Sequence, residues 1–260
     1  MTFIPRQDQV DRLSGLSITK SNVLNGLSPI VTKTGTGQTP SHITDPDHSV
    51  NYTTSTASES FDVSFGRVST ISYVAISGHN TASDAQGTIE LYDDTELIDS
   101  VILQRSNNIM FTFVTRTFSN LMVRFIKTPL AAQSIVSFIA AGQHMTIESG
   151  EQAGYSRLWL NRHTKQRTTT NNNTAPTSVL TIGTSLSGNL SLPNELATKI
   201  EGEWQEFVDF SFAEPFFIKE VADKPESTYI CFNPKHGIKA HPLTRVLDSV
   251  TLSFEAYNGL

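Results

Sequence analysis

The side chains best able to do chemistry in this 260-residue chain are its seven histidines and its single cysteine. No two histidines have the i, i+4 spacing with which a helix presents a pair of metal ligands. The closest pair, His236 and His241, is flanked by proline and glycine, which predicts a solvated loop rather than a metal site. Cys231 has no partner for a disulfide within the chain, and the apolar alternation around it predicts a buried thiol. The chain also lacks a nucleophile elbow and a phosphate-binding loop, so we expect a protein that is not an enzyme.

A short segment, Asp45-Pro-Asp-His-Ser-Val-Asn51, brings two carboxylates and an amide within seven residues. Calcium requires about six to eight oxygen ligands, and this segment supplies only part of that number. We therefore predict a turn without a cofactor, and keep calcium binding as the alternative. Tyr52 and His79 are the ring-bearing loop residues of the same half of the chain. The candidate ligand-binding residues are Asp45, Asp47, Asn51, Tyr52 and His79.

One basic run stands out in a chain with 19 Lys and Arg, 25 Asp and Glu, and a formal charge of −6. It comprises Arg157, Arg162, Lys165 and Arg167. We take Arg162, Lys165 and Arg167 as a candidate interface with an acidic partner surface, with a solvated strand and loop as the alternative. The net acidity gives no field that would attract a phosphate backbone, so nucleic acid is excluded as the main partner.

The composition favours antiparallel β-structure. Only 17% of the residues are charged, 38% are hydrophobic, and 60 of them are serine or threonine. Hydroxyl-rich, β-branched sequence is typical of the exposed faces of antiparallel sheets. The amino-terminal residues lack the charged and apolar regions of a signal peptide, and no run approaches about 18 apolar residues, so we expect no export signal and no transmembrane helix. Synthesis and folding in a cytoplasm follow from this expectation.

Seven candidate strands with short turns between them predict an antiparallel β-sandwich over residues 40–147, preceded by an extension over residues 1–39. Their apolar residues either alternate or are β-branched throughout, and glycine, proline or paired aspartates end most of them. The candidate strands are 60–65, 68–77, 88–92, 97–103, 109–114, 120–127 and 135–141.

The pattern changes after Gly150, which predicts a second, α+β unit over residues 152–260. A polar, low-complexity loop is expected at 165–176, and a hairpin at 178–192 with Gly183 or Gly188 at its turn. An amphipathic helix is expected at 194–210, capped by Asn194, and it should lie on an antiparallel sheet. The apolar stripe of that helix is Leu196, Ile200, Trp204 and Phe207, and the strands of the sheet are 156–162, 216–219, 228–232 and 249–257.

Several segments of the first half resemble the discoidin-like (coagulation factor 5/8 type C, galactose-binding-like) jelly rolls. Phe61-Asp-Val-Ser-Phe-Gly66 resembles one strand of that family, and Asn120-Leu-Met-Val-Arg-Phe-Ile126 resembles another. The resemblance covers residues 40–146 and implies a jelly-roll sandwich. The terminal cysteine pair and the exposed loop aromatics of the family are absent here, so its ligand binding is not carried over.

The second half is similar in style to tail-tip and distal-tail structural proteins of tailed bacteriophages. The similarity rests on Tyr155-Ser-Arg-Leu-Trp-Leu160, on the helix around Trp204 with the following Pro215-Phe-Phe-Ile218, and on the last alternating run, 250–257. It implies a non-enzymatic virion subunit of a tail tip, distal tail or baseplate. Such a subunit would be assembled in the host cytoplasm and would contact copies of itself in a ring, other tail proteins and a host glycan, with no membrane insertion.

Two other functions remain open from the sequence. The first is a soluble carbohydrate-binding module formed by residues 40–147. The second is a hydrolase whose site is assembled from Asp62, His79 and Glu90, which share no local motif.

Overall fold

A computed structural model gives the fold of this chain, which is mainly β, with antiparallel sheets and, among the described residues, a single α-helix. The described residues are 16–33, 35, 39–45, 51–57, 60–82, 86–127, 133–147, 166–169, 176–180, 186–196, 200–240 and 247–257.

An antiparallel β-sandwich forms the first half. One layer is a five-stranded sheet in the order β2 (Ile30–Val31), β4 (Ser60–Ser64), β9 (Leu121–Lys127), β6 (Gly87–Asp93) and β7 (Glu96–Leu103). The other layer holds a three-stranded sheet in the order β11 (Phe138–Gly142), β5 (Val68–Ser77) and β8 (Ile109–Phe118). It also holds the pair β10 (Gln133–Val136) and β3 (Tyr52–Ala57), with the short 3₁₀ helix η1 (Pro40–Ile43) nearby.

Alternation of side chains decides which face of the five-stranded sheet is buried. In β4, Phe61 and Val63 are buried while the residues on either side are partly exposed. Phe61 stacks on Phe125 of β9 with ring centroids 4.6 Å apart. These side chains join apolar residues of the opposite layer in one core, which burial of apolar surface stabilises. The other face of the five-stranded sheet therefore remains available to solvent or to a ligand.

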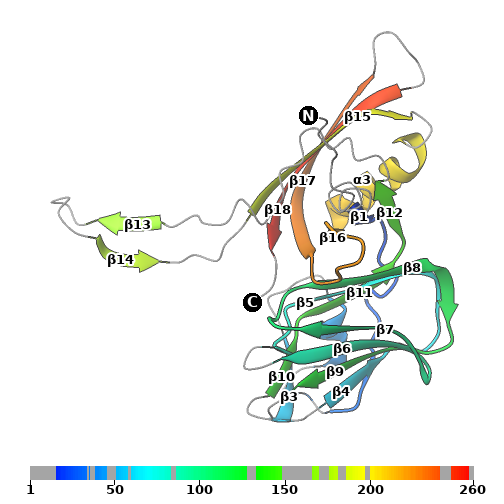
Figure 1. The fold of residues 1–260 in the computed structure, drawn as a ribbon, viewed down its shortest axis with the longest axis vertical. Coiled ribbons are helices and arrows are strands. Elements are labelled where there is room, and N and C mark those ends of the chain that lie inside the picture. The colour runs from blue at the N-terminus through cyan, green and yellow to red at the C-terminus, as the bar shows by residue number, and fades with distance from the viewer. Residues whose placement is uncertain are drawn as a thin grey trace, which may run out of the picture.

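A six-stranded antiparallel sheet forms the second half and lies against the sandwich (Figure 1). Its order is β12 (His144–Ile147), β1 (Leu16–Thr19), β16 (Phe216–Lys219), β17 (Thr228–Ala240), β18 (Leu247–Tyr257) and β15 (Leu186–Leu196). A separate pair, β13 (Gln166–Thr169) and β14 (Pro176–Leu180), lies away from the other sheets (Figure 1).

One helical segment covers the six-stranded sheet on the side away from the sandwich. A π-helical turn, Ile200–Trp204, leads into α3 (Gln205–Ala213). Trp204 and Phe207 of the predicted apolar stripe are buried against the sheet, whereas Leu196 of that stripe lies in β15. The helix begins later than predicted, because Asn194 lies in β15, where Glu195 and Leu196 pair with β18. Cross-strand pairing thus overrides the local capping signal.

Three other expectations for the second half need correction. The predicted hairpin at 178–192 does not form, because β14 pairs with β13 and β15 pairs with β18. The predicted loop at 165–176 contains β13, whose residues pair with β14 despite their polar composition. His236 lies in β17 rather than in a loop, opposite Leu252 of β18. In each case the strand pairs with a segment that its own local pattern does not identify.

The two halves share a third apolar cluster, which joins the three-stranded sheet to the six-stranded sheet. Phe138 of β11 and Phe217 of β16 stack across this seam with ring centroids 6.0 Å apart. In β16, Phe216 and Ile218 belong to the cluster beneath α3, whereas Phe217 faces the sandwich. Consistent with a layer covered on both sides, every described residue of β11 is buried.

The extension predicted at 1–39 contributes a strand to each half. β2 pairs with β4 of the sandwich, and β1 lies between β12 and β16 of the six-stranded sheet. Residues 144–147, which the sequence placed at the end of the sandwich, form β12 at the edge of that same sheet. Because Thr19 pairs with His144, the chain enters and leaves the sandwich at neighbouring positions. The sandwich is thus inserted between two paired strands of the other sheet.

Candidate functional site

Of the five predicted ligand-binding residues of the sandwich, the structure describes Asp45, Asn51, Tyr52 and His79. Asp45 is exposed just after η1, and Asp47 lies outside the described residues. Asn51 precedes β3, and its side-chain oxygen accepts a hydrogen bond from the Ser137 hydroxyl. The carbonyl of Gly78 lies 2.9 Å from the same hydroxyl. These contacts tie the loop before β3 to the loop after β5.

Contrary to expectation, Tyr52 and His79 are both core residues. Tyr52 is 2% exposed, and its hydroxyl donates a 2.7 Å hydrogen bond to the carbonyl of Lys33. His79 is fully buried, with its Nε2 2.7 Å from the carbonyl of Asn107. Burial lowers the pKa of His79 to about 4, because the charged imidazolium would lose its hydration. Neither ring presents a surface to a ligand.

The hydrolase constellation is not assembled either. Asp62 and Glu90 lie opposite Arg124, on the outer face of the five-stranded sheet. His79 packs against Phe125, whose side chain is in the core on the inner face. The sheet therefore separates the two carboxylates from the imidazole, which excludes a shared reaction centre for these three groups.

The carboxylates instead belong to a polar cluster around Arg124, which we call the outer-face cluster: Asp62, Glu90, Tyr92 and Arg124. Arg124 donates two hydrogen bonds to Asp62, from Nε at 2.8 Å and from one terminal nitrogen at 3.1 Å. Its guanidinium lies over the ring of Tyr92, 5.1 Å from the centroid. The hydroxyl of Tyr92 donates a 2.7 Å hydrogen bond to Glu90. Each of the four side chains is held by at least one of the others.

Strand register produces this cluster. Asp62 of β4 and Glu90 of β6 both pair with Arg124 of β9, so the three polar side chains form one row across the sheet. Tyr92 lies two residues after Glu90, on the same face. The pKa of Arg124 is raised, above all by its hydrogen bonds to Asp62, and the hydrogen bond to Glu90 raises the pKa of Tyr92. The cluster thus holds a guanidinium, two carboxyl groups and a phenol in fixed positions.

Sequence reasoning named Asp62 and Glu90 but missed their connection through Arg124. The sequence does indicate that all three are polar residues, each at a position where the apolar–polar alternation of its strand directs the side chain away from the core. What the sequence does not contain is the register that places them in one row.

The other predicted sites lie elsewhere or outside the described residues. Arg162 and Lys165 of the candidate partner interface lie outside them, and Arg167 is a residue of β13 opposite Val179. Within the described ranges, no group of three or more His, Cys, Asp or Glu side chains is placed to hold a metal ion. None of the described helical segments has the length and apolarity needed to cross a lipid bilayer.

Comparisons with known proteins give only distant structural likenesses. Neither a protein-family model nor a curated protein matches the chain. A chitosan-binding module of a chitosanase/glucanase from Paenibacillus sp. IK-5 is 12% identical, with a TM-score of 0.36, over 46% of this chain and 98% of the module. A fucose-binding module of Streptococcus pneumoniae is 11% identical, with a TM-score of 0.37, over 47% of this chain and 94% of the module.

A Clostridium perfringens module in complex with GalNAc-β-1,3-galactose is 8% identical, with a TM-score of 0.37, over 47% of this chain and 99% of that module. At these identities and scores, the likenesses carry no argument about what this chain binds. Any function proposed for it rests on its own side chains.

Proposed function

We propose that this chain is a non-enzymatic binding protein whose sandwich half binds a polyhydroxylated ligand of the glycan class through the outer-face cluster. The observation that supports the proposal is the row of planar polar groups held in place by one another. Sugar hydroxyls both donate and accept hydrogen bonds, so a site for them needs carboxylate acceptors and guanidinium donors close together. A partly exposed tyrosine adds a ring surface for the C–H face of a sugar.

The cluster is organised before a ligand arrives. The fork between Arg124 and Asp62 and the bond between Tyr92 and Glu90 fix side chains that would otherwise lose rotamer freedom on binding. Each carboxylate keeps acceptor positions that these bonds do not use. Binding of a ligand therefore requires little further ordering of these side chains.

A glycan array followed by calorimetric titration tests this proposal on the full chain. We expect Arg124→Gln and Tyr92→Ala to abolish or strongly weaken binding of any glycan identified on the array. Arg116→Gln is the matched control, because the side chains of Arg116 and Arg124 are both 36% exposed and each is paired with one aspartate. Binding that survives Arg124→Gln, or no binding on the array, contradicts the proposal.

We also propose, as a second candidate function, a virion subunit of a phage tail in which the β13–β14 pair contacts a neighbouring subunit. The β13–β14 pair lies away from the other sheets (Figure 1), where it can contact a neighbouring subunit. The test is mass spectrometry of purified phage particles from the source of this sequence. Detecting the chain in particles at a fixed copy number supports this function, and its absence contradicts it.

A further inference from the structure

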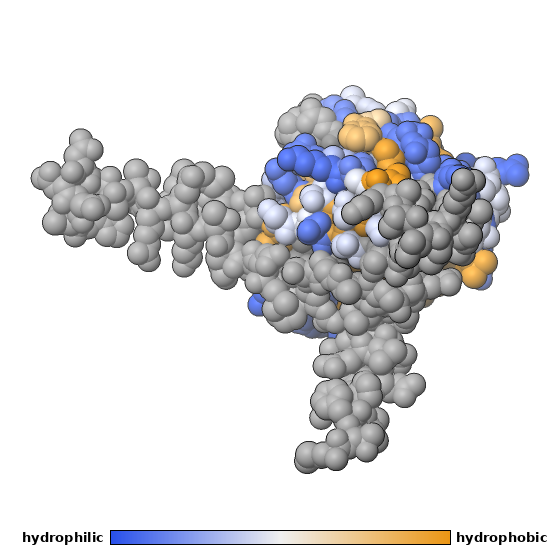
Figure 2. Space-filling view, turned by 90° about the horizontal axis from the view of Figure 1, so that it is seen from above, coloured by the Kyte–Doolittle hydropathy of each residue, from blue (hydrophilic) through white to orange (hydrophobic). Residues whose placement is uncertain are grey.

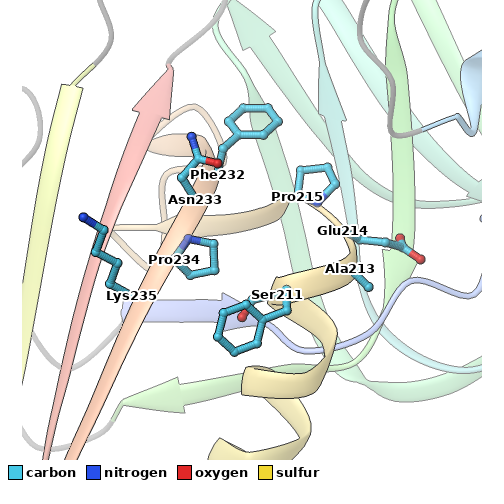
Figure 3. Close-up of a pocket in the computed structure, with 9 residues that line it drawn as sticks. Ser211, Ala213, Glu214, Pro215, Phe232, Asn233, Pro234 and Lys235 are labelled. Atoms are coloured by element: carbon cyan, nitrogen blue, oxygen red, sulfur yellow. The ribbon is translucent and has the colours of Figure 1, made fainter.

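A groove of about 600 Å³ lies in the second half of the molecule, far in sequence from the outer-face cluster. It is bounded by the last turn of α3 and by a bulged stretch of β17 (Figure 3). Its lining includes Phe212, Glu214, Pro215, Phe232, Pro234 and Lys235.

Backbone irregularities on both sides create this groove. The register of β17 against β18 shifts between Phe232 and Lys235, and Asn233 has a φ of 52° within the bulge. On the other side, α3 ends at Ala213 and Glu214 takes an extended conformation that turns the chain toward Pro215. The bulge and the helix end leave between them a hollow that neither element fills.

The hollow lies beside an unusually exposed aromatic side chain. Phe212 is 68% exposed, and one edge of its ring meets His236, with ring centroids 5.3 Å apart. Phe232, on the opposite wall, contacts Tyr257, which is 36% exposed. Large exposed apolar residues next to a concave surface mark interaction sites in soluble proteins.

Exposed apolar side chains continue around the groove. Val23 and Leu27 lie in the loop that contacts Glu214, and Ile238 follows Lys235 in β17. Seen from above, the apolar residues on the described part of the molecule form patches among polar ones (Figure 2).

The two ends of the groove carry opposite charges. Glu214 is held at one end by the side-chain amides of Asn22 and Asn25, at 3.0 Å and 2.7 Å. Lys235 is exposed at the other end and forms no ion pair within the described part of the chain. Figure 3 shows the two side chains on opposite sides, with Pro215, Pro234 and Phe232 between them.

We propose that this groove is the contact surface of a homodimer, in which a second copy of the chain docks across a twofold axis. A twofold axis brings Lys235 of each copy to Glu214 of the other, because the charges lie at opposite ends of one surface. It also lets Phe212 of each copy enter the hollow of its partner. The surface thus carries its own complement in charge, and this inference does not depend on glycan binding.

Sedimentation velocity of the full chain, from roughly 1 μM to 1 mM, tests the proposal. We expect a monomer–dimer equilibrium whose dissociation constant rises about tenfold or more on Phe212→Ser, since an aromatic anchor in a hollow dominates such contacts. Val114→Ser is the matched control, because Val114 is 89% exposed on β8 of the sandwich and should leave the equilibrium unchanged.

A charge exchange tests the twofold geometry independently of Phe212. Lys235→Glu and Glu214→Lys each place like charges together at both ends, so each variant alone should dimerise less. Mixing the two variants should restore a heterodimer, because both ends again pair opposite charges. Far-UV circular dichroism checks that each variant is folded.

Three results would overturn the proposal. The first is a chain that stays monomeric over the whole concentration range. The second is a dimer that Phe212→Ser leaves unchanged, or that the mixed variants fail to restore. The third is a closed ring of more than two copies, since it requires a head-to-tail contact in place of a twofold one.

Discussion

The two layers of the sandwich share one apolar core but differ in what covers their outer faces. The five-stranded sheet leaves its outer face open, and there the side chains of β4, β6 and β9 are polar or partly exposed. The three-stranded sheet has its outer face buried beneath the six-stranded sheet, and residues 74–76 of β5 are buried without alternation. The comparison shows that one face of the sandwich joins the two halves, whereas the outward-facing residues of the other are partly exposed.

Polar side chains at the covered face form hydrogen bonds across the seam between the two halves. The ammonium group of Lys219 in β16 contacts the hydroxyl of Thr112 in β8, and it lies 2.9 Å from the carbonyl of Ala222. Burial lowers the pKa of Lys219 to about 8. His144 of β12 is bonded to Ser72 of β5, with its Nδ1 2.8 Å from the hydroxyl. Such contacts fix the position of one sheet on the other, whereas the polar groups of the open face remain within reach of solvent.

The largest expected effect comes from breaking the seam. Phe217 is fully buried and stacks on Phe138, so Phe217→Ala should lower the free energy of unfolding by about 3–5 kcal/mol. Because both halves share the seam, far-UV circular dichroism and tryptophan fluorescence should report one common denaturant transition, shifted to lower midpoint. As a control, Val114→Thr on the exposed part of β8 should stay within about 0.5 kcal/mol of the parent. Two separate transitions, with the sandwich unaffected, would show that the halves are energetically independent.

Acid should destabilise both regions through buried histidines. Burial lowers the pKa of His79 in the sandwich and of His144 at the seam to about 4, against an ordinary value of 6.5. The unfolded chain therefore binds protons that the folded chain does not between these pH values. Stability should fall as the pH drops from about 6.5 to about 4, by up to about 3 kcal/mol for each histidine, and the loss should level off below that range.

Denaturant titrations at pH 7, 5.5 and 4 measure the free energy of unfolding at each pH. His144→Gln should reduce the dependence of this free energy on pH. Val114→Thr, a substitution at an exposed position of β8, is the control. If the free energy of unfolding of His144→Gln depends on pH as steeply as that of the parent, burial at the seam does not lower the pKa of His144.

The smallest effect is expected on the open face. Asp62→Asn removes the charge of an ion pair whose arginine is 36% exposed, so the free energy of unfolding should fall by no more than about 1 kcal/mol. Glycan affinity, if the outer-face cluster is the site, should fall far more than stability. Thermal melting and calorimetric titration of Asp62→Asn measure its stability and its glycan affinity. A large loss of stability would show that Asp62 has a structural role instead.

Most of the sandwich strands could be predicted from the sequence because each has its own local pattern. The predicted strand 135–141, however, is divided at Ser137 into β10 and β11, and β3 was not predicted. Alternation in Phe61-Asp-Val and the β-branched run of β5 place these strands within a residue or two of their observed ends. The contact between Phe217 and Phe138 across the seam could not be predicted from the sequence. The two residues are far apart in the chain, and neither local pattern indicates which residue will pack against it. The helix start failed for the same reason, because the pairing of Glu195 with Asp248 decides it.

The candidate site shows the same limit. Asp62 and Glu90 could be picked out as polar residues in apolar strands, but their common neighbour Arg124 follows only from the order β4-β9-β6. Conversely, Tyr52 and His79 looked available because they stand next to predicted turns, and the structure buries both. Proximity to a turn in the sequence is therefore a poor guide to exposure when loops fold back over the end of a sandwich.

The insertion of the sandwich between β1 and β12 has a consequence for synthesis on the ribosome. Strand β1 emerges early, but its neighbour β16 follows it by about 200 residues, which at roughly 5–20 residues per second is a delay of about 10–40 seconds. The core of the sandwich, by contrast, is drawn almost wholly from one contiguous stretch and can form while the ribosome is still adding the second half. Because the last strand of the sandwich leads into β12, folding of the sandwich places β12 beside β1. The β1–β12 pair then offers a free strand edge on which β16, and after it β17 and β18, can assemble.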